Sequence, residues 1–313
     1  MASFADACGE VPLPEIVAFG LNRLRAISYL ARFGAHLRQL GLTQDEVISL
    51  QTATVEQTAR LAAVAGARAG WLADPEAHLR VSGCTLMAVV GEDAGSTIDI
   101  PFLDQEALLE RFASLQHDVR LWIGIDPHRP GSVDTALALL QHPRACGAAL
   151  SPFMAGTELD SEPYATVLRA LADRNVPIWV HCSAHFDPRV SYDIGHPRHI
   201  DAALRRHPGL RLVIGHAGWP WTDEACIVAI RHPSVALEFS TFPPSLLPQP
   251  GWSLTPLLAQ RGALTGRIFF GSGGVSAPKR LLRLLAQLEA LDLGDDLPAW
   301  RGAGLRRWLR LDA

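Results

Sequence analysis

The sequence has no long hydrophobic run. Its apolar stretches have strand length, well short of the roughly 18 residues that span a membrane, so we expect no membrane segment. The charge balance also lacks a basic excess: the formal net charge is −4 and the isoelectric point lies near 6.3, which excludes an electrostatic nucleic-acid binder. The N-terminal residues show no basic segment followed by an apolar one. We therefore expect no secretory signal and a cytoplasmic protein.

Cysteine is scarce as well. The 5 cysteines are widely scattered and form no Cys-x-x-Cys pair, which argues against a disulfide framework or a cysteine-rich zinc site. We expect reduced thiols. What the chain does have is 48% hydrophobic residues in a length of 313, enough for one large globular domain over residues 1–313.

Short apolar segments alternate with helical ones after residue 80. The predicted strands are 84–90, 119–125, 147–150, 176–181, 210–215, 235–239 and 267–270, and residues 2–7 supply an eighth. Helices are predicted at 105–114, 132–140, 164–174, 197–206, 222–231 and 278–290. Repeated strand–helix units favour a parallel sheet, so we predict an α/β fold, a (β/α)8 TIM barrel.

A long helical segment separates the first predicted strand from the second. Residues 13–75 are rich in Ala, Leu and Arg, and their apolar spacing predicts two or three amphipathic helices. Thr43 and Glu46 have the spacing of a capping box at the start of one of them. We interpret this segment as an insertion after strand one that forms a lid or an oligomer surface; a separate small helical domain is the alternative.

Two histidines end consecutive strands of the predicted barrel. His181 follows the run from Val176, and His216 follows the run from Leu210. The carboxyl ends of the strands form the rim where barrel active sites lie. A single such histidine is equally compatible with a buried structural role, but two on adjacent strands indicate a site.

From about residue 83 the chain resembles the amidohydrolase-2 family, which includes decarboxylases, hydratases and lactone hydrolases on (β/α)8 barrels. The resemblance rests on Ile123-Gly-Ile-Asp-Pro127, residues 147–152, residues 176–181, and Phe270-Gly-Ser272. Its most specific part is Gly215-His216-Ala-Gly-Trp-Pro220, followed by Asp223-Glu-Ala225. It implies a divalent metal held by residues of strands one, five and eight, with the strand-six histidine assisting. His181 then matches the strand-five ligand, and His216 the strand-six residue.

The other metal positions depart from the family pattern. Strand one reads Asp6-Ala-Cys8-Gly-Glu10 in place of two histidines, and the strand-eight aspartate is replaced by Gly273. Glycine has no side chain to hold a metal or to accept a proton from water. We therefore predict a metal-independent site. The alternative is a zinc or manganese ion on Cys8, Glu10 and His181, since Cys8 and Glu10 share a strand face.

Three functions follow, and the sequence leaves all three open. The first is an amidohydrolase-like enzyme of specialised metabolism that hydrolyses, decarboxylates or otherwise cleaves a carboxylated or carbonyl-bearing small molecule. His216, His181 and Glu10 would act as acid–base groups. The second is a covalent acyl transfer on a Cys8 nucleophile. The third is an inactive binding or scaffold subunit.

Further polar or aromatic residues near strand ends are predicted to contact the substrate. They are His185, Asp126, Glu238, Ser240, Ser272 and Trp219. The only partners expected are the small-molecule substrate and further copies of this chain in a homo-oligomer, with neither nucleic acid nor membrane.

Overall fold

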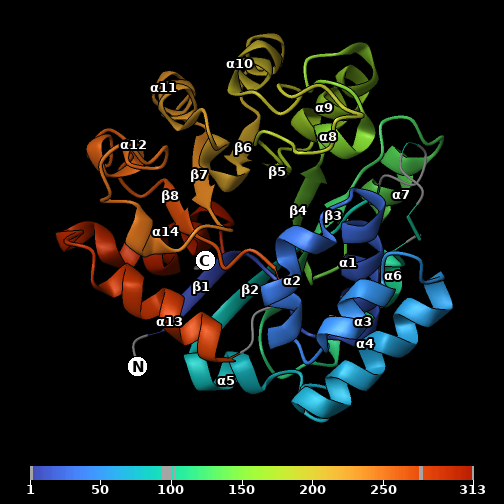
Figure 1. Cartoon of the computed structure of the whole chain (residues 1–313). Coiled ribbons are helices and arrows are strands. Elements are labelled where there is room, and N and C mark those ends of the chain that lie inside the picture. The colour runs from blue at the N-terminus through green and yellow to red at the C-terminus, as the bar shows by residue number, and fades with distance from the viewer. Residues whose placement is uncertain (1–2, 94–96, 98–99, 102, 275–277, 312–313) are drawn as a thin grey trace.

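Eight parallel strands form the centre of the protein. The computed structural model describes residues 3–93, 97, 100–101, 103–274 and 278–311. The strands are β1 (Phe4–Gly9), β2 (Cys84–Val90), β3 (Val119–Gly124), β4 (Ala145–Leu150), β5 (Pro177–Val180), β6 (Arg211–Ile214), β7 (Val235–Phe239) and β8 (Ile268–Phe270). Each strand pairs with the next along the chain, and Figure 1 shows them in a ring with helices outside. The predicted TIM barrel is confirmed, with strand ends close to the predicted ones; residue 2, expected in the first strand, lies outside the described residues.

The seam between the first and last strands is held by Asp6 and the backbone of Cys8. The backbone N–H of Ser272 donates to the Asp6 carboxyl group at 3.0 Å, and that of Gly273 donates to the Cys8 carbonyl oxygen at 2.8 Å. The Asp6 carboxyl group also accepts from the backbone N–H of Cys8. These bonds join the two ends of the sheet, so Asp6 serves the closure of the barrel.

Side chains of the strands alternate between the barrel interior and the helical layer. The interior holds a cluster that includes Trp122, Trp179 and Phe269, while a larger cluster packs between strands and helices. Trp122 and Phe269 are completely buried. Burying each such side chain stabilises the folded protein by about 1.5–3 kcal/mol. This stabilisation favours the closure of short apolar strands into a barrel.

The predicted helices after residue 100 are all present. The helices that follow β2 are α6 (Gln105–Ala113), α7 (Ser132–Leu139), α8 (Pro152–Ala155), α9 (Glu162–Asp173), α10 (Pro197–Arg206), α11 (Thr222–Arg231), α12 (Pro256–Ala259), α13 (Pro278–Glu289) and α14 (Gly304–Trp308). Asp104 caps the start of α6, because its carboxyl group accepts from the backbone N–H of Ala107 at 2.9 Å.

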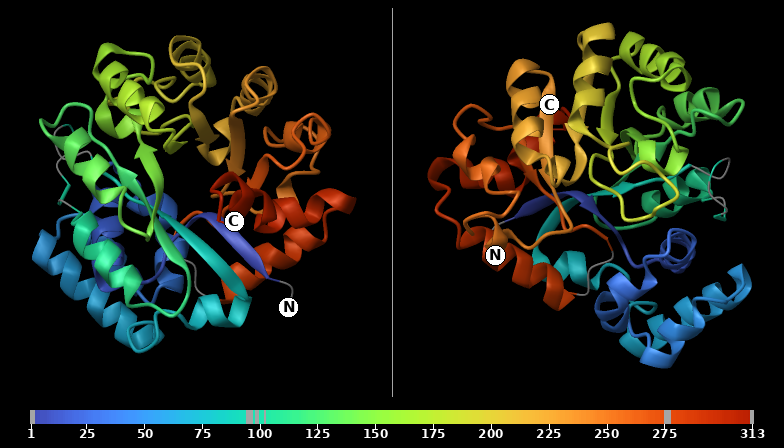
Figure 2. Two further views of the ribbon diagram at one scale, coloured as in Figure 1. Left: turned by 180° about the vertical axis from the view of Figure 1, so that it is seen from behind. Right: turned by 45° about the horizontal axis from the view of Figure 1, so that its top comes forward.

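Helices fill the chain between β1 and β2. They are α1 (Pro14–Ala26), α2 (Leu30–Gln39), α3 (Gln44–Ser49), α4 (Val55–Ala69) and α5 (Ala77–Ser82), and the capping box of Thr43 and Glu46 is formed. In both views of Figure 2 the blue helices α1 to α4 lie together at one side of the barrel. α1 packs on both sides: Ile16 belongs to the barrel's outer cluster and Leu21 to a cluster of the helices' own. This double packing fixes α1 close to the strand ends.

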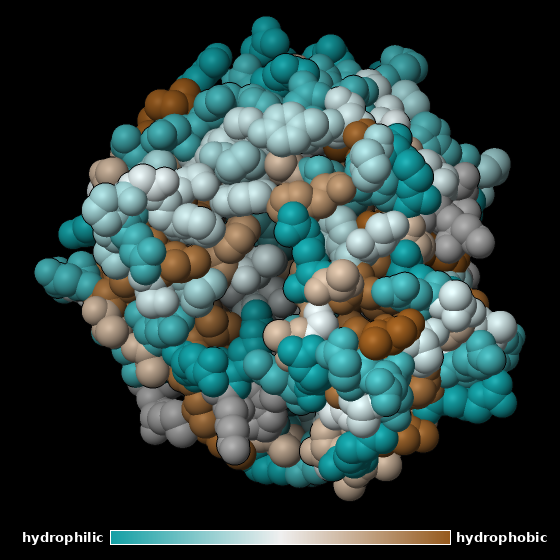
Figure 3. Space-filling view, in the orientation of Figure 1, coloured by the Kyte–Doolittle hydropathy of each residue, from teal (hydrophilic) through white to brown (hydrophobic). Residues whose placement is uncertain are grey.

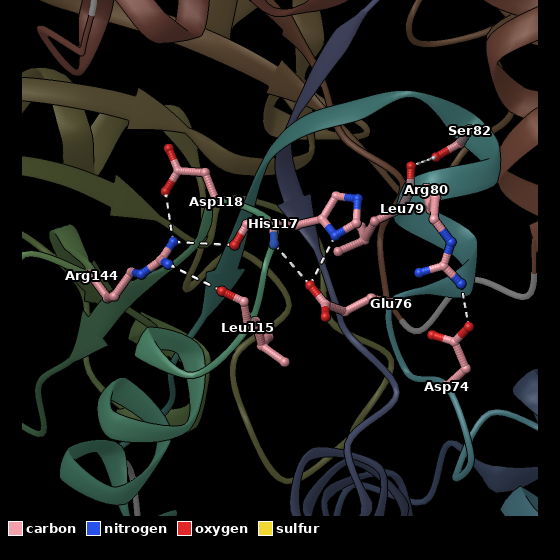
Figure 4. Close-up of polar contacts among 9 residues, drawn as sticks. All are labelled: Asp74, Glu76, Leu79, Arg80, Ser82, Leu115, His117, Asp118 and Arg144. Carbon is pink, nitrogen blue, oxygen red and sulfur yellow. Dashed lines mark hydrogen bonds and ion pairs between the residues drawn. The ribbon is translucent and has the colours of Figure 1, made fainter.

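A polar network binds the amino-terminal ends of the strands (Figure 4). Arg144, just before β4, donates to the carboxyl group of Asp118, just before β3, at 3.1 Å and to the carbonyl oxygen of His117 at 3.2 Å. The Glu76 carboxyl group accepts from the backbone N–H of His117 at 2.8 Å. Because active sites of such barrels lie at the opposite end, this network serves stability.

No helix within the described part of the chain is both long and apolar enough to cross a membrane. In Figure 3, hydrophobic residues are interspersed with hydrophilic ones over α1 to α3, and no continuous hydrophobic band covers this face.

Candidate active site

A cavity of about 510 Å³ opens at the carboxyl ends of the strands. Residues that follow β1, β2, β5 and β6 line it on one side, and residues of α1 and α2 line it on the other. The predicted site residues on its wall are Cys8, Glu10, His181, His185, His216 and Trp219. Size, position and lining fit a small-molecule site.

His181 and His216 lie next to each other on the floor of this cavity. The centroids of their rings are 4.8 Å apart and the ring planes make an angle of 72°. Trp179, on β5, presents an edge-on contact to both rings, with centroids 6.1 Å from His181 and 5.7 Å from His216. The two imidazoles are therefore positioned by the barrel interior beneath them.

The backbone at His216 is left-handed, with φ of 54°, and Ala217 follows with φ of 50°. Such values are uncommon for residues other than glycine and store strain of about 1–3 kcal/mol each. Gly215 precedes them because a Cβ there would lie 2.5 Å from the Trp179 ring. The Gly-His-Ala-Gly sequence thus serves a sharp turn that aims His216 at the cavity.

Both histidines are neutral at pH 7. Burial, aided by the nearby positive charge of Arg23, lowers the pKa of His216 to about 4. Burial, followed by the charges of His216, His185 and Arg23, lowers the pKa of His181 well below its usual value. Each ring therefore has one nitrogen that accepts and one that donates a hydrogen bond.

A buried polar chain lies behind His216. Nδ1 of His216 is 2.8 Å from the Ser240 hydroxyl oxygen, and the Ser240 side chain also interacts with the Glu238 carboxyl group. That carboxyl group accepts from Nε1–H of Trp179 at 3.1 Å and from the backbone N–H of His216 at 3.3 Å. Burial raises the pKa of Glu238 to about 7, so it exchanges a proton near neutral pH.

The structure does not place four of the predicted substrate contacts on the cavity wall. Asp126, Glu238, Ser240 and Ser272 are at most 1% exposed and lie outside its lining. Asp126 accepts from the backbone N–H of His128 at 2.9 Å, while the Ser272 backbone belongs to the barrel seam. Residues that follow one another near a strand end point to different faces, so proximity to the end alone does not bring a side chain to the pocket.

The sequence prediction missed Arg23 and Glu92. Arg23 projects from α1 into the cavity and forms an ion pair with Glu92, which lies just after β2. Nε of Arg23 is buried and has no hydrogen-bond partner among the described residues. The strand-end rule that found His181 would have found Glu92. No local sequence signal marks Arg23, because its role depends on where α1 packs.

The residues present do not fit the metal that the family pattern implies. Among the described residues there is no group of three His, Cys, Asp or Glu side chains placed to hold a metal ion, so Cys8, Glu10 and His181 are not assembled as ligands. At Gly273 a Cβ would lie 2.3 Å from the Thr241 backbone nitrogen, and φ is +67°. A side chain at that position is excluded without backbone movement.

Cys8 is predicted to resist alkylation. Burial, followed by the negative charge of Glu238, raises the pKa of the Cys8 thiol well above its usual value. Burial also raises the pKa of the other four thiols. Because the thiolate is the reactive form, we expect no labelling by iodoacetamide at neutral pH until the protein is unfolded. Rapid labelling of Cys8 in the folded protein, read by mass spectrometry, would instead support the nucleophile hypothesis.

The fold and the cavity define a (β/α)8 barrel with paired histidines after strands five and six. A family model described as Amidohydrolase matches residues 72–280, which is more than half of the chain. The chain therefore belongs to the amidohydrolase family, as its motifs predicted. No curated protein matches the sequence.

Solved structures share the fold at low sequence identity. An uncharacterized TIM-barrel protein from Bordetella bronchiseptica is 16% identical with a TM-score of 0.67, covering 99% of both chains. 2,6-Dihydroxybenzoate decarboxylase from Rhizobium is 15% identical with a TM-score of 0.55, covering 75% of this chain and 87% of that one. 5-Carboxyvanillate decarboxylase from Novosphingobium aromaticivorans, complexed with manganese and a nitrobenzoic acid, is 12% identical with a TM-score of 0.58, covering 99% and 96%.

Proposed function

We propose that this protein is an enzyme that decarboxylates a small aromatic acid without a metal, with His216 and His181 as its acid–base pair. The observation that carries the proposal is the contact between two neutral histidines on the cavity floor, with ring centroids 4.8 Å apart, where the described residues offer no donor set for a metal. The decarboxylases among the structural neighbours support the reaction class: one is named for 2,6-dihydroxybenzoate and another for 5-carboxyvanillate.

Arg23 supports a carboxylate substrate. Its guanidinium group lies in the cavity, and Nε–H has no acceptor among the described residues. A charge-assisted bond to a substrate carboxylate would satisfy this donor and hold the acid over the histidines. Glu10, also on the wall, would help to orient the polar groups of the ring.

In the proposed reaction, the bond between ring carbon and carboxyl carbon breaks, CO₂ leaves, and a proton takes its place on the ring carbon. Since Nδ1 of His216 bonds to Ser240, Nε2 is the nitrogen that transfers this proton. As Nε2 gives up its proton, Nδ1 takes one from the Ser240 hydroxyl group, which takes one from the Glu238 carboxylic acid, so the imidazole stays neutral. Glu238 regains a proton from solvent before the next turnover, and its pKa of about 7 suits that exchange at neutral pH. His181 holds the substrate hydroxyl group beside the reacting carbon.

The test is CO₂ release from chelator-treated protein supplied with 2,6-dihydroxybenzoate, 5-carboxyvanillate and related hydroxybenzoates. We expect turnover that added zinc or manganese does not change, from protein with no bound metal by elemental analysis. Turnover that depends on an added metal would contradict metal independence. Binding of these acids without any product would favour the inactive scaffold. The replacement of the family's metal-binding aspartate by Gly273 is compatible with that function as well.

A further inference from the structure

The part of the cavity lined by α2 and Phe186 is mostly apolar, and decarboxylation of a small benzoic acid makes no use of it. Leu24, Phe33 and Leu37 of α1 and α2 line one side. Phe153, Phe186 and Trp219, from segments that follow β4, β5 and β6, line the other. Arg23 and Glu92 lie with the histidines in the lining contributed by the strand ends and α1, and two polar side chains of α2, Arg32 and His36, line the cavity as well.

Two contacts hold these walls together over the cavity. The backbone N–H of Phe186 donates to the Tyr29 hydroxyl group at 2.7 Å, and the Arg32 guanidinium carbon lies 3.6 Å from the centroid of the Phe186 ring. Tyr29 directly precedes α2 and Arg32 lies in it, whereas Phe186 follows β5. The insertion and the barrel thus enclose an apolar chamber.

Aromatic rings continue from the histidines into this chamber. The Phe153 ring is 4.5 Å from that of His181 and stacks on His185 at 3.9 Å. His185 in turn stacks on Tyr29 at 5.0 Å. Flat aromatic walls favour a ligand with an aromatic body, and apolar walls favour substituents without polar atoms.

We propose that the ligand of this cavity is a lipophilic aromatic acid, whose carboxylated ring lies on the histidines and whose alkyl substituent occupies the chamber between α1, α2 and Phe186. The inference rests on the proposed function, because that function places the carboxylated ring of the ligand against His181 and His216. It adds the substrate class: unsubstituted hydroxybenzoates leave the chamber unfilled and bind weakly. A substituent gains affinity from each methylene that it buries against the chamber walls.

The test measures binding separately from turnover. 2-Hydroxybenzoate and its 6-propyl, 6-pentyl and 6-heptyl derivatives are titrated by calorimetry into wild-type protein, and CO₂ release is assayed in parallel. We expect the Kd to fall about threefold to fourfold for each methylene added. Phe186→Ser should weaken binding of the heptyl compound about tenfold and leave 2-hydroxybenzoate unaffected. Tyr192→Ser is the matched control, because Tyr192 is an exposed ring of the same loop outside the cavity lining.

A Kd that does not change with chain length overturns the inference, even where CO₂ is released. An equal effect of Phe186→Ser and Tyr192→Ser on the heptyl compound overturns it as well. Tightening with chain length in the absence of any CO₂ supports the chamber and contradicts the proposed decarboxylation. The two proposals therefore fail separately.

Discussion

Replacing His216 with asparagine is expected to lower kcat by about 10²- to 10⁴-fold, the usual contribution of a positioned acid–base group. Asparagine keeps a hydrogen-bonding group near Ser240 and tolerates the left-handed backbone at this position, so the fold should survive. It has no ring nitrogen to exchange a proton with the substrate. Steady-state kinetics and circular dichroism of the variant, with the acid that turns over best, provide the measurement.

His142→Asn is the matched control for this prediction. His142 lies between α7 and β4, and its ring is 3.8 Å from Glu110, away from the cavity lining. The kcat of the His142→Asn variant should equal that of the wild type. Ser240→Ala should give an intermediate loss, because it removes the link from His216 to Glu238 but keeps the imidazole. A folded H216N variant that turns over at the wild-type rate would remove His216 from the mechanism.

The second large effect is loss of stability in acid. Burial lowers the pKa of seven histidines, and it acts most strongly on five of them: His36, His78, His181, His185 and His216. The unfolded chain takes up a proton at each of the five near pH 6.5, whereas in the folded chain the pKa is about 4 for His36, His78, His185 and His216 and is well below its usual value for His181. The unfolded state therefore binds more protons in this window, and the free energy of unfolding falls as the pH falls.

Two buried carboxyl groups oppose this trend. Burial raises the pKa of Glu238 to about 7 and also raises that of Asp6, so the folded chain keeps protons that the unfolded chain releases. Their contribution to stability is present below the unfolded pKa and is lost as the pH rises. The five histidines outnumber these two carboxyl groups, so the free energy of unfolding still falls as the pH falls from 6.5 to 4.5.

Urea unfolding between pH 6.5 and 4.5 measures this slope. Since native proteins have only about 5–15 kcal/mol of stability, we expect unfolding well before pH 4. His78→Leu should lower the proton uptake on unfolding by about one, because His78 is buried on α5 and lies outside the cavity lining. Equal stability at both pH values would mean that these histidines are protonated in the folded protein.

Much of the fold followed from local patterns. Runs such as 84–90 and 235–239 are buried on almost every residue, and that burial demands helices on one side and a filled interior on the other. The site was predictable in part for the same reason, because His181 and His216 directly follow such runs. The homo-oligomer and the cytoplasmic location remain predictions.

Other features required the packed chain. Glu238 reads in sequence as a strand-end acid near the pocket, but the pairing of β7 with β6 and β8 puts its carboxyl group behind His216. The sequence alone showed that Gly273 offers no metal donor. It did not show that the Thr241 backbone lies too close to Gly273 for a side chain to fit there. Whether a residue faces a cavity depends on register and turn geometry, which hydrophobic patterning does not encode.

The sequence by itself determined the barrel, the family and the two histidines, since each depends on residues close together in the chain. Only the tertiary structure decided which groups surround them. Arg23 and Glu92 are 69 residues apart in the chain. They pair because α1 packs both on the barrel and on the other helices of the insertion. The neutral histidines, the protonatable Glu238 and the apolar chamber arise in the same way. Burial creates them, and burial is a property of the assembled chain.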